Sequence, residues 1–580
     1  MAQQARTMAI AEQHEPKGFI QKYVFSQDHK VIGLQYIFTA MAMCLVGGGL
    51  SVMIRAQLTW PENAWGAEGA APLVSPEAYL SWVTMHGTIM VFFVVSLALV
   101  SGFGNFLIPL MIGARDMAYP FLNMLSYWTI VPACLLMLVS FLVEGGAAAA
   151  GWTAYPPLSA LPEAVPGSGL GQTLWLLAMA LFIVSFTMGG LNYIVTILNC
   201  RAAGMSLMRL PLTVWTYLTS AVLGVLAFPP LTAAAIMLLL DRHAGTSFFL
   251  PGGLVFGNEV TPHDGGTPLL FQHLFWFLGH PEVYVLVLPG IGITFDIIAT
   301  FARRSIFGYR TSVWSLVIVG FLSMIVWGHH MYVTGMNPYI GEYFSIATVL
   351  ITAPFAVLGM NLVASLWRSR ISFEAPMLWA LGTVAVIGAG GFGGLFLATS
   401  ISDIYFHETF FVVGHFHLMI GVVTTLSIFG GVYHWFPKMF GRKMNRRLAN
   451  LHFWTTYLPI VGVFVLMHFQ GMSGLLRRYY DHSIYDFGGD GKVLALTITY
   501  LTIITAGSQV IFLANFAHSL FKGEVAGSNP WLATTLEWTS PSPAPHGNWA
   551  GTLPLVERGP YEYDPGREYG EDFTPQGASQ

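Results

Sequence analysis

Apolar and polar residues follow one another along this chain in long blocks. Twelve predominantly apolar runs, each longer than about 18 residues, are separated by shorter polar segments. Runs of this length predict helices that cross a membrane, whereas the strands of a membrane barrel would be short segments of alternating polarity. The pattern therefore predicts an all-α polytopic membrane protein with twelve transmembrane helices. The spans begin near residues 32, 83, 126, 173, 212, 269, 312, 342, 375, 406, 452 and 493.

The composition agrees with a membrane protein. Hydrophobic residues make up 54% of the chain and charged residues only 9%, whereas soluble domains contain roughly 25% charged residues. The three cysteines lie in or beside apolar runs and form no CxxC pair, so neither a disulfide framework nor a thiolate metal site is expected. Residues 1–30 are polar and lack an apolar signal core, so no cleaved signal peptide is expected.

The positions of Lys and Arg predict the orientation of the chain. The terminal segments and the loops after spans 2, 4, 6, 8 and 10 hold 20 of the 25 basic residues. By the positive-inside rule both termini lie in the cytoplasm. The predicted parts are a cytoplasmic N-terminal segment (1–31), a twelve-helix core (32–522) and a cytoplasmic C-terminal extension (523–580) with several Pro and Gly. The basic residues on the outer side are Arg55, Arg242, Arg477, Arg478 and Lys492.

Histidines are the main ionisable residues inside the apolar spans, and such residues mark functional sites by default. A single one would more often be a hydrogen-bonded packing residue. Six on four spans, with almost no Lys or Arg at the same depth, favour metal coordination, because neutral imidazole is the commonest metal ligand. They are His86, His280, His329, His330, His415 and His417.

The spacing of His415 and His417 predicts two metal centres rather than one. Residues two apart on an α-helix are separated by about 200° around its axis, so the two imidazoles point to nearly opposite faces. They cannot share one metal, but each can serve a different centre beside the same helix. The spacing predicts two cofactors a helix width apart, which suits electron transfer between them.

The motif HPEVY places three functional groups in another span. His280 and Tyr284 are four residues apart and share one helix face, while Glu282 points elsewhere. Packing would explain Tyr284, and Pro281 is tolerated in a membrane helix. A carboxylate in an apolar span has no such explanation, and desolvation favours its protonated form. Glu282 is therefore a candidate for proton transfer.

These motifs together resemble subunit I of the heme–copper oxygen reductases, the family of cytochrome c and quinol oxidases, in its bacterial members. The similar segments occur in the family's order over about residues 24–550 and include FSQDHKVIG, HGTIMVFF, QHLFWFLGHPEVYVLVLPG, VWGHHMYVTGM, HETFFVVGHFHLMIG and GMSGLLRRYYD. The resemblance implies the catalytic subunit of a terminal respiratory oxidase in the bacterial inner membrane. Such an enzyme reduces oxygen to water with four electrons and couples this reaction to proton uptake and pumping.

The resemblance also implies two hemes in the interior of the helices. His86 and His417 would be the axial ligands of a low-spin heme iron, and His415 the ligand of a high-spin heme iron. Arg55 matches the arginine beside a substituent of the low-spin heme. Heme A is expected, with heme O or heme B as alternatives.

A copper ion, copper B, is implied opposite the high-spin heme, where oxygen binds. His280, His329 and His330 would be its ligands. Tyr284 would be joined covalently to His280, and would supply an electron and a proton for cleavage of the O–O bond.

Groups near the outer surface are implied to hold charged parts of the cofactors. Arg477, Arg478 and Trp152 would meet heme propionates, and two adjacent guanidiniums suit carboxylate pairing. His407 and Glu408 match a pair that helps to bind a magnesium ion. Glu408 replaces the family's aspartate, so the geometry of this magnesium site is open.

The resemblance implies one proton route from the cytoplasm. Asp116, in the loop after span 2, matches the entry aspartate of the family's D-pathway, Asn123 and Asn192 match polar positions along it, and Glu282 matches its inner end. A salt bridge with Arg115 is the alternative explanation for Asp116.

The chain departs from the family at the second proton route. Leu358 stands where most close relatives have a pathway lysine, and Phe355 where they have a threonine; none of the spans contains Lys. The usual K-pathway is therefore expected to be absent. We expect protons for the chemistry to enter through Asp116 and Glu282, or by an unrecognised route.

The electron donor is open at this point. Quinol oxidases of the family place an Arg and an Asp where this chain has Val46 and Leu50. That difference favours cytochrome c or another periplasmic carrier, through a subunit II with a dinuclear copper site, beside a subunit III. The segment ARDMAYPFLN also resembles the quinol branch, so a ubiquinol oxidase is the first alternative.

Two further functions explain less of the sequence. A nitric oxide reductase would not be expected to carry the HPEVY tyrosine together with the entry aspartate. A non-enzymatic twelve-helix transporter explains the spans, but leaves six intramembrane histidines without partners.

Overall fold

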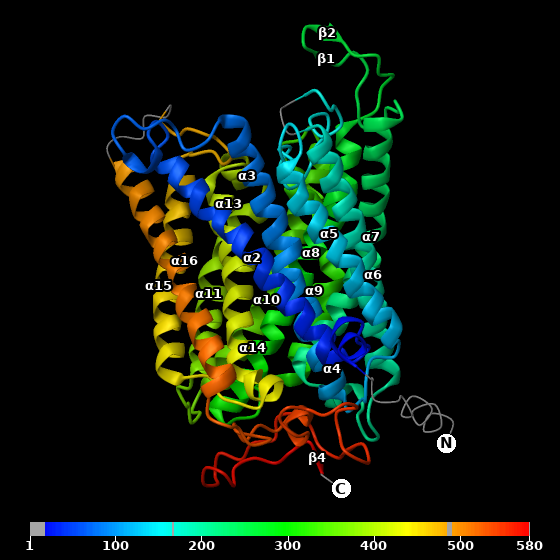
Figure 1. Cartoon of the computed structure of the whole chain (residues 1–580), viewed down its shortest axis with the longest axis vertical. Coiled ribbons are helices and arrows are strands. Elements are labelled where there is room, and N and C mark those ends of the chain that lie inside the picture. Colours follow the sequence, from blue (N-terminus) through cyan, green and yellow to red (C-terminus); the bar gives the residue numbers. More distant parts are fainter. Residues whose placement is uncertain (1–17, 165–167, 484–489, 579–580) are drawn as a thin grey trace.

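The protein is a bundle of long helices with a folded tail across one end (Figure 1). Its structure, a computed structural model, describes residues 18–164, 168–483 and 490–578. Within these residues, eleven helices are long and apolar enough to cross a membrane. They are α2 (His29–Thr59), α3–η3–α4 (Pro76–Ile112), α5 with the turn η4 (Pro120–Leu142), α6 (Leu170–Asn199), α7 (Leu212–His243), α8 (Pro268–Ala302), α10 (Pro338–Leu366), α11 (Ala375–Ala398), α13–η7–α14 (Phe410–Phe440), α15 (Arg446–Met472) and α16 (Asp490–Lys522).

These helices occupy the predicted spans, and the largest difference in starting residue is at the second span, which begins at Pro76 rather than near residue 83. Two of them change to a wider π-type winding along their length. The first has the parts α3 (Pro76–Thr88), η3 (Ile89–Phe103) and α4 (Gly104–Ile112), and the second has α13 (Phe410–Phe416), η7 (His417–Val422) and α14 (Val423–Phe440). Local π-type winding is frequent at functional sites, and here η7 begins at a candidate ligand.

The seventh predicted span has a different form from the others. Helix α9 (Tyr309–Ser323) has 15 residues, so it is about 22 Å long, less than the roughly 30 Å of membrane hydrocarbon. The short 3₁₀ segment η6 (Trp327–Met331) continues the crossing. A Cβ atom on Gly328 would lie 2.2 Å from the Phe344 ring of α10, so a glycine is required where η6 packs on that helix.

Both ends of the described chain lie at the same end of the bundle, with η1 (Ile20–Val24) in dark blue and the tail in red (Figure 1). An even number of crossings is needed for this arrangement, and α9 with η6 supplies the twelfth. The remaining short helices are η2 (Ala64–Gly66), η5 (Leu207–Arg209), α12 (Ser400–Phe406) and η8 (Leu536–Thr539).

Polar side chains determine where several helices begin. The Asp28 carboxylate accepts from the backbone N–H of Lys30 at the start of α2, and the Asn445 side chain accepts from two N–H groups at the start of α15. Asn337 and Thr409 cap α10 and α13 in the same way. Each cap satisfies a helix N–H that has no partner within the helix.

Strands are limited to two small antiparallel pairs in the part of the chain that the structure describes. β1 (Val255–Phe256) pairs with β2 (Glu259–Val260) in a hairpin opposite the tail (Figure 1). β3 (Leu555–Val556) pairs with β4 (Gly577–Ala578) within the tail.

Helix α8 lies at the centre of the bundle, because its most apolar stretch is entirely buried. The corresponding stretch of α3–η3–α4 is 89% buried, whereas that of α2 or α16 is 22% buried. The two buried helices carry His86, His280, Glu282 and Tyr284. These four candidate residues are therefore on the most deeply buried of the membrane-spanning helices.

The tail after α16 lies across the helix ends, and buried polar contacts hold it there. Arg303, at the end of α8, forms an ion pair with Asp572 in which both side chains are at most 2% exposed. The ammonium of Lys438 donates to the Ser540 carbonyl oxygen at 2.7 Å. These contacts connect the tail directly to α8 and α14.

We expect Asp572→Ala to destabilise the protein by about 3–5 kcal/mol, because it leaves the Arg303 charge buried and unpaired. Thermal inactivation of the purified protein and protease cleavage of the tail measure the effect. Glu562→Ala is the matched control, since Glu562 forms an exposed ion pair with Arg558 in the same tail and should change stability by less than about 0.5 kcal/mol. Equal effects of the two variants would contradict the anchoring role of Asp572.

Candidate functional site

One large cavity runs through the middle of the bundle. Its volume is about 1580 Å³ and it is lined by residues of α2, α3, α8, α10, α11, α13 and α15. All predicted ligand and cofactor residues line it, whereas Asp116, Asn123 and Asn192 do not. The predicted residues are His86, His280, His329, His330, His415, His417, His407, Glu408, Arg55, Trp152, Glu282, Tyr284, Arg477 and Arg478.

Three histidines meet at one wall of the cavity. His280 comes from α8, and His329 and His330 come from η6. One nitrogen of each lies within 4.8 Å of the others, and no second group of three metal-ligating side chains this close occurs among the described residues. Nδ1 of His329 lies 3.0 Å from the hydroxyl oxygen of Thr348, and this hydroxyl donates to the carbonyl oxygen of Phe344. The hydroxyl therefore accepts from Nδ1–H of His329, and Nε2 keeps its lone pair. Three neutral imidazoles at this spacing suit a copper or zinc ion.

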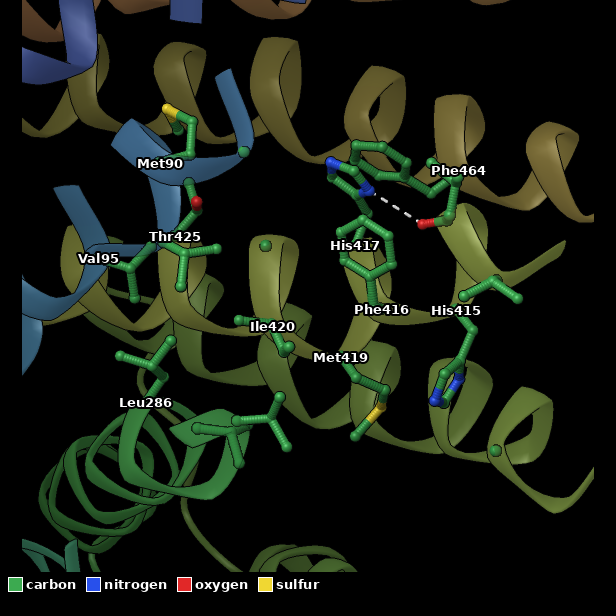
Figure 2. A pocket seen from close by; sticks show the side chains of 18 of the residues that line it. Met90, Val95, Leu286, His415, Phe416, His417, Met419, Ile420, Thr425 and Phe464 are labelled. Carbon is green, nitrogen blue, oxygen red and sulfur yellow. Dashed lines mark hydrogen bonds between the residues drawn. The ribbon is translucent and has the colours of Figure 1, made fainter. Parts of the chain in front are cut away.

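His415 and His417 point to opposite sides of their helix, and Figure 2 shows the two rings directed away from each other. His417 faces His86 of α3 with parallel rings, at a centroid separation of 6.3 Å and an interplanar angle of 9°. Two metal–nitrogen bonds of about 2 Å each, added to the ring radii, account for such a separation. His415 instead lies against α11. The geometry therefore allows two separate centres beside one helix, as the spacing predicts.

The same hydrogen bond orients each of these three imidazoles. Nδ1 of His86 lies 2.8 Å from the carbonyl oxygen of Gly47, that of His415 3.0 Å from Gly390, and that of His417 2.9 Å from Val413. A carbonyl oxygen only accepts, so Nδ1 carries the hydrogen and Nε2 keeps its lone pair. Metal-binding histidines are held in this way by their second nitrogen.

Glycines leave room for large flat groups beside the histidines. A Cβ atom on Gly394 would lie 3.1 Å from the His415 ring, so α11 approaches the ring where it has no side chain. A Cβ atom on Gly48, Gly388 or Gly391 would have no atom within 4 Å, although all three positions line the cavity. The space and the Nε2 lone pairs fit two macrocycles.

Tyr284, His280 and Trp276 form one stripe along α8. The rings of His280 and Tyr284 are 4.9 Å apart, and the Trp276 ring stacks on His330 at 3.8 Å. The buried Nε2 of His280 has no hydrogen-bond partner among the described residues. A link between Tyr284 and His280 stays a prediction, and the two rings are close enough to permit it.

Arg477 and Glu408 are paired with each other at the outer end of the cavity. The Arg477 guanidinium binds both carboxylate oxygens of Glu408, with its Nε at 2.9 Å from Oε2. Burial would raise the pKa of Glu408, but Arg477 holds it at about 2. Nδ1 of His407 lies 3.1 Å from the carboxylate oxygen Oδ2 of Asp403, which accepts its hydrogen, and Nε2 of His407 lies 4.0 Å from Oε1 of Glu408. The roles of Arg477 with a propionate and of Glu408 with magnesium remain predictions.

The other residues predicted to contact the cofactors are Arg478, Trp152 and Arg55, and all three line the same cavity. Burial and the neighbouring Arg477 lower the pKa of Arg478 to about 10, so it stays charged at neutral pH. Trp152 packs on Gly87, one residue from His86. The Nε and Nη1 atoms of Arg55 are buried and have no hydrogen-bond acceptor within the described chain, which fits a polar cofactor substituent.

Asp116 lies in the loop between α4 and α5, at the end of the bundle covered by the tail. Its carboxylate accepts from the N–H of Met117 at 2.7 Å, and it is only 9% exposed. Burial, and then the charge of Asp28, raise the pKa of Asp116 to about 8. Arg115 donates instead to the carbonyl oxygen of Gly551 in the tail, and no salt bridge joins it to Asp116 in the described residues.

Polar residues follow Asp116 into the bundle. Asn123 is fully buried, and both of its amide atoms are without a partner among the described residues. Beyond it, the Tyr36 hydroxyl lies 3.0 Å from that of Ser126 and 3.4 Å from that of Ser185. Asn192 is engaged by the backbone N–H and carbonyl of Tyr119, one residue before α5.

Glu282 is buried on α8. Its Oε1 accepts from the Ser96 hydroxyl of η3 at 3.4 Å, and its Oε2 has no partner in the part of the chain described. A buried carboxyl with one free oxygen can rotate between two acceptors, as a proton carrier requires.

Two apolar side chains on α10 stand at the positions where the sequence departs from the family pattern. Leu358 is 1% exposed and belongs to the large buried hydrophobic core. The Phe355 ring contacts Tyr284 at a centroid separation of 6.4 Å. The structure thus places no polar side chain at either departure from the family pattern.

Four neighbours of the site were not anticipated. Trp276 could have been found, because it lies four residues before His280 on the same helix face. Asp403 could have been found in the same way, because it lies four residues before His407. Ser96 and Thr348 carry no local signal, since their partners come from other helices.

Comparison with known proteins shows the family of the chain. Residues 31–522 match the family model "Cytochrome C and Quinol oxidase polypeptide I". The chain is 47% identical over 568 residues to "Alternative cytochrome c oxidase subunit 1" of Bradyrhizobium diazoefficiens, covering 97% of this chain and 94% of the relative. It is 40% identical over 541 residues to "Cytochrome c oxidase subunit 1" of Thermostichus vulcanus, covering 93% of this chain and 92% of the relative.

A heme–copper terminal oxidase solved as a dimer by cryo-electron microscopy has the same fold, with a TM-score of 0.65 at 18% identity over 86% of this chain and 85% of that chain. The family implies hemes, copper B and a multi-pass membrane location. The chain belongs to the cytochrome c and quinol oxidase polypeptide I family and is an oxidoreductase, the catalytic subunit of a terminal oxidase.

Proposed function

We propose that this chain reduces oxygen to water at a heme–copper centre, with electrons from cytochrome c or another periplasmic carrier. The observation that carries the proposal is the arrangement of histidines around a single cavity. Three of them converge on one point, and His415 and His417 point to opposite sides of the helix that carries them. The balanced reaction is O₂ + 4 e⁻ + 4 H⁺ → 2 H₂O.

His280, His329 and His330 would hold copper B, and the Thr348 hydroxyl would orient His329. His86 and His417 would bind the low-spin heme and His415 the high-spin heme, each through Nε2. These groups, when bound, supply the one-electron chemistry and the place where oxygen binds. Heme A is our expectation, with heme O or B as alternatives.

The chain itself supplies protons and orientation. Tyr284 lies beside His280, so its hydroxyl hydrogen is available at the wall of the cavity where oxygen would be reduced. Glu282 would carry protons from Ser96 towards the same cavity. Arg55, Trp152, Arg477 and Arg478 would contact the heme edges and propionates, where fixed cations stabilise carboxylates in a region with little water.

We propose that protons for chemistry and for pumping share one inlet through Asp116, Asn123, Asn192 and Glu282. Support comes from the polar column above Asp116 and from the apolar packing of Leu358 and Phe355 on the alternative side. An apolar contact offers no hydrogen-bonded chain for a proton.

We also make a proposal about the electron donor and the companion subunits. The family generally pairs subunit I with a subunit II, and we infer one that carries a dinuclear copper site, together with a subunit III. Val46 and Leu50 present apolar, partly buried side chains on α2, which do not bind a quinol head group through hydrogen bonds. Oxidation of reduced cytochrome c by the purified complex, compared with oxidation of ubiquinol, separates this proposal from the ubiquinol oxidase alternative.

A magnesium ion would be held at the outer surface by His407 and Glu408 with ligands from another subunit. Glu408 would then be shared with Arg477. We further propose the bacterial inner membrane as location, with the N-terminal segment (1–31) and the C-terminal extension (523–580) in the cytoplasm and the core (32–522) between them. The split of basic residues supports this orientation.

The composition of the purified protein tests the function most directly. We expect two hemes for each copper ion bound by this chain, and two heme signals in the reduced-minus-oxidised visible spectrum. His417→Ala should remove the low-spin signal and spare the high-spin one, while His415→Ala should do the reverse. Loss of the same signal in both variants would contradict two centres.

Thr348→Val should lower copper occupancy roughly tenfold under limiting copper, because it removes the acceptor that orients His329. Metal analysis measures the effect. Thr352→Val is the control, since Thr352 lines the same cavity without contacting the three histidines through a hydrogen bond in the described structure. Unchanged copper in Thr348→Val would show that the hydroxyl does not orient the ligand.

Glu282→Gln should reduce oxygen consumption by at least about tenfold, because a single inlet leaves no other carrier for the protons of the chemistry. An oxygen electrode measures the rate of the chemistry, and proton release from vesicles measures pumping. Near wild-type rates of both would contradict the shared route.

A further inference from the structure

A second cavity lies between the tail and the helix ends, where α8 and α16 end and α15 begins (Figure 1). Its volume is about 550 Å³, which is within the range of small-molecule binding sites. It shares no lining residue with the large cavity that contains the histidines. Its basic lining residues are Arg303, Lys443, Arg446, His518 and Lys522.

The basic side chains reach this cavity from different elements of the fold. Lys443 lies in the loop between α14 and α15, Arg446 is the first residue of α15, and Lys522 is the last residue of α16. Residues 438–447, which include that loop, contain five Lys or Arg and no Asp or Glu. Lys522 forms no ion pair among the described residues. The positive charge at the cavity is therefore not fully balanced by the protein.

The other two of these three cations are paired at the surface. Nζ of Lys443 lies 3.6 Å from Oε1 of Glu524, whose side chain is 75% exposed. Nη1 of Arg446 lies 3.2 Å from Oε1 of Glu374, and the Arg446 side chain is 58% exposed. Exposed ion pairs of this kind contribute little to stability. An anion with a higher charge can therefore compete with the two carboxylates for the same cations.

Two aromatic rings of the tail complete the wall of the cavity. Nζ of Lys443 lies 5.6 Å from the ring centre of Trp531, and the Arg303 guanidinium lies 5.1 Å from that of Tyr569. Tyr569 is 66% exposed, so part of its ring surface is available for contact. Ammonium and guanidinium groups bind phosphate, and aromatic rings stack on the flat bases of nucleotides. The cavity has both kinds of group.

We propose that this basic cavity binds a phosphate-bearing anion, with the phosphate at Lys443, Arg446 and Lys522. A nucleoside di- or triphosphate has this chemistry, and so has the headgroup of an anionic lipid, since basic pockets at helix ends bind such headgroups. The rings of Trp531 and Tyr569 favour the nucleotide, because a lipid headgroup has no flat base. The inference goes beyond the proposed function and concerns neither the hemes nor the proton inlet, so its test needs no turnover.

Titration calorimetry of the purified complex with ATP, in neutral detergent without Mg²⁺, tests the proposal. Binding should be saturable and should weaken as salt is added. Lys522→Gln and Arg446→Gln should each weaken it by about tenfold, because each removes one charge-assisted contact with phosphate. Both side chains are exposed, so the heme spectrum and the thermal stability of the variants should stay as in wild type.

Arg447→Gln is the matched control. Arg447 follows Arg446 in the same basic loop and is exposed, but it does not line the cavity. The control removes the same charge, and ATP binding should not change. Equal affinities in wild type, Lys522→Gln and Arg446→Gln would overturn the proposal. An equal loss in Arg447→Gln would also contradict it, since ATP would then respond only to the overall charge of the loop.

Lipid analysis of the same samples distinguishes the two sources of phosphate. If the site holds a lipid headgroup, ATP should not bind, and the phosphatidylglycerol that stays with the complex through detergent washing should decrease in Lys522→Gln but not in Arg447→Gln. If neither ATP binding nor lipid retention depends on Lys522 and Arg446, the cavity is not a phosphate site.

Discussion

The hydrogen bond from histidine Nδ1 to a fixed acceptor is the interaction on which the site depends. In an apolar interior an imidazole without partners is costly, and it can rotate to satisfy either nitrogen. Carbonyl oxygens of Gly47, Gly390 and Val413 remove this choice for three rings. Two of these carbonyls, those of Gly47 and Gly390, belong to neighbouring helices. The orientation of these two imidazoles therefore depends on how the helices pack. Gly47 and Gly390 allow the backbones to approach at two of these contacts, because a Cβ atom at either would lie 2.9 Å from a side chain of the facing helix.

Much of this arrangement could be predicted from the sequence because it depends on local spacing. Two residues separated by one position must face apart on a helix, which is why His415 and His417 behave as expected. His280 and Tyr284 share a face for the same reason. The length of apolar runs likewise determines where membrane helices lie, since a helix must satisfy its own backbone in lipid. Only α9 is shorter than a membrane-spanning helix should be. The α-helix ends early there, and the 3₁₀ segment η6 that follows brings His329 and His330 beside His280 of α8.

The rest could not be predicted because it depends on residues far apart in the chain. Thr348 contacts His329 from α10, and Ser96 contacts Glu282 from η3. Hydroxyls such as these are common in apolar helices, where they bond to their own backbone, so their presence indicates no partner. The pairing of Arg477 with Glu408 could not be predicted for the same reason, because the two residues are far apart in the chain. Each residue matched a separate cofactor contact, whereas the fold brings them together as one ion pair.

The tail gives the clearest case of a long-range contact with a chemical consequence. A bundle of apolar helices ends in exposed caps and basic loops, and a carboxylate such as Asp116 would ordinarily be solvated there. The tail covers the loop through Asn548 and Gly551, which buries Asp116 and raises its affinity for a proton. Burial also slows access from solvent. The same segment carries His546, whose Nδ1 lies 3.0 Å from a carboxylate oxygen of Asp28, the residue that caps α2. The contacts that fix the tail to the helix ends are therefore also the contacts that bury the carboxylate at the mouth of the proposed inlet.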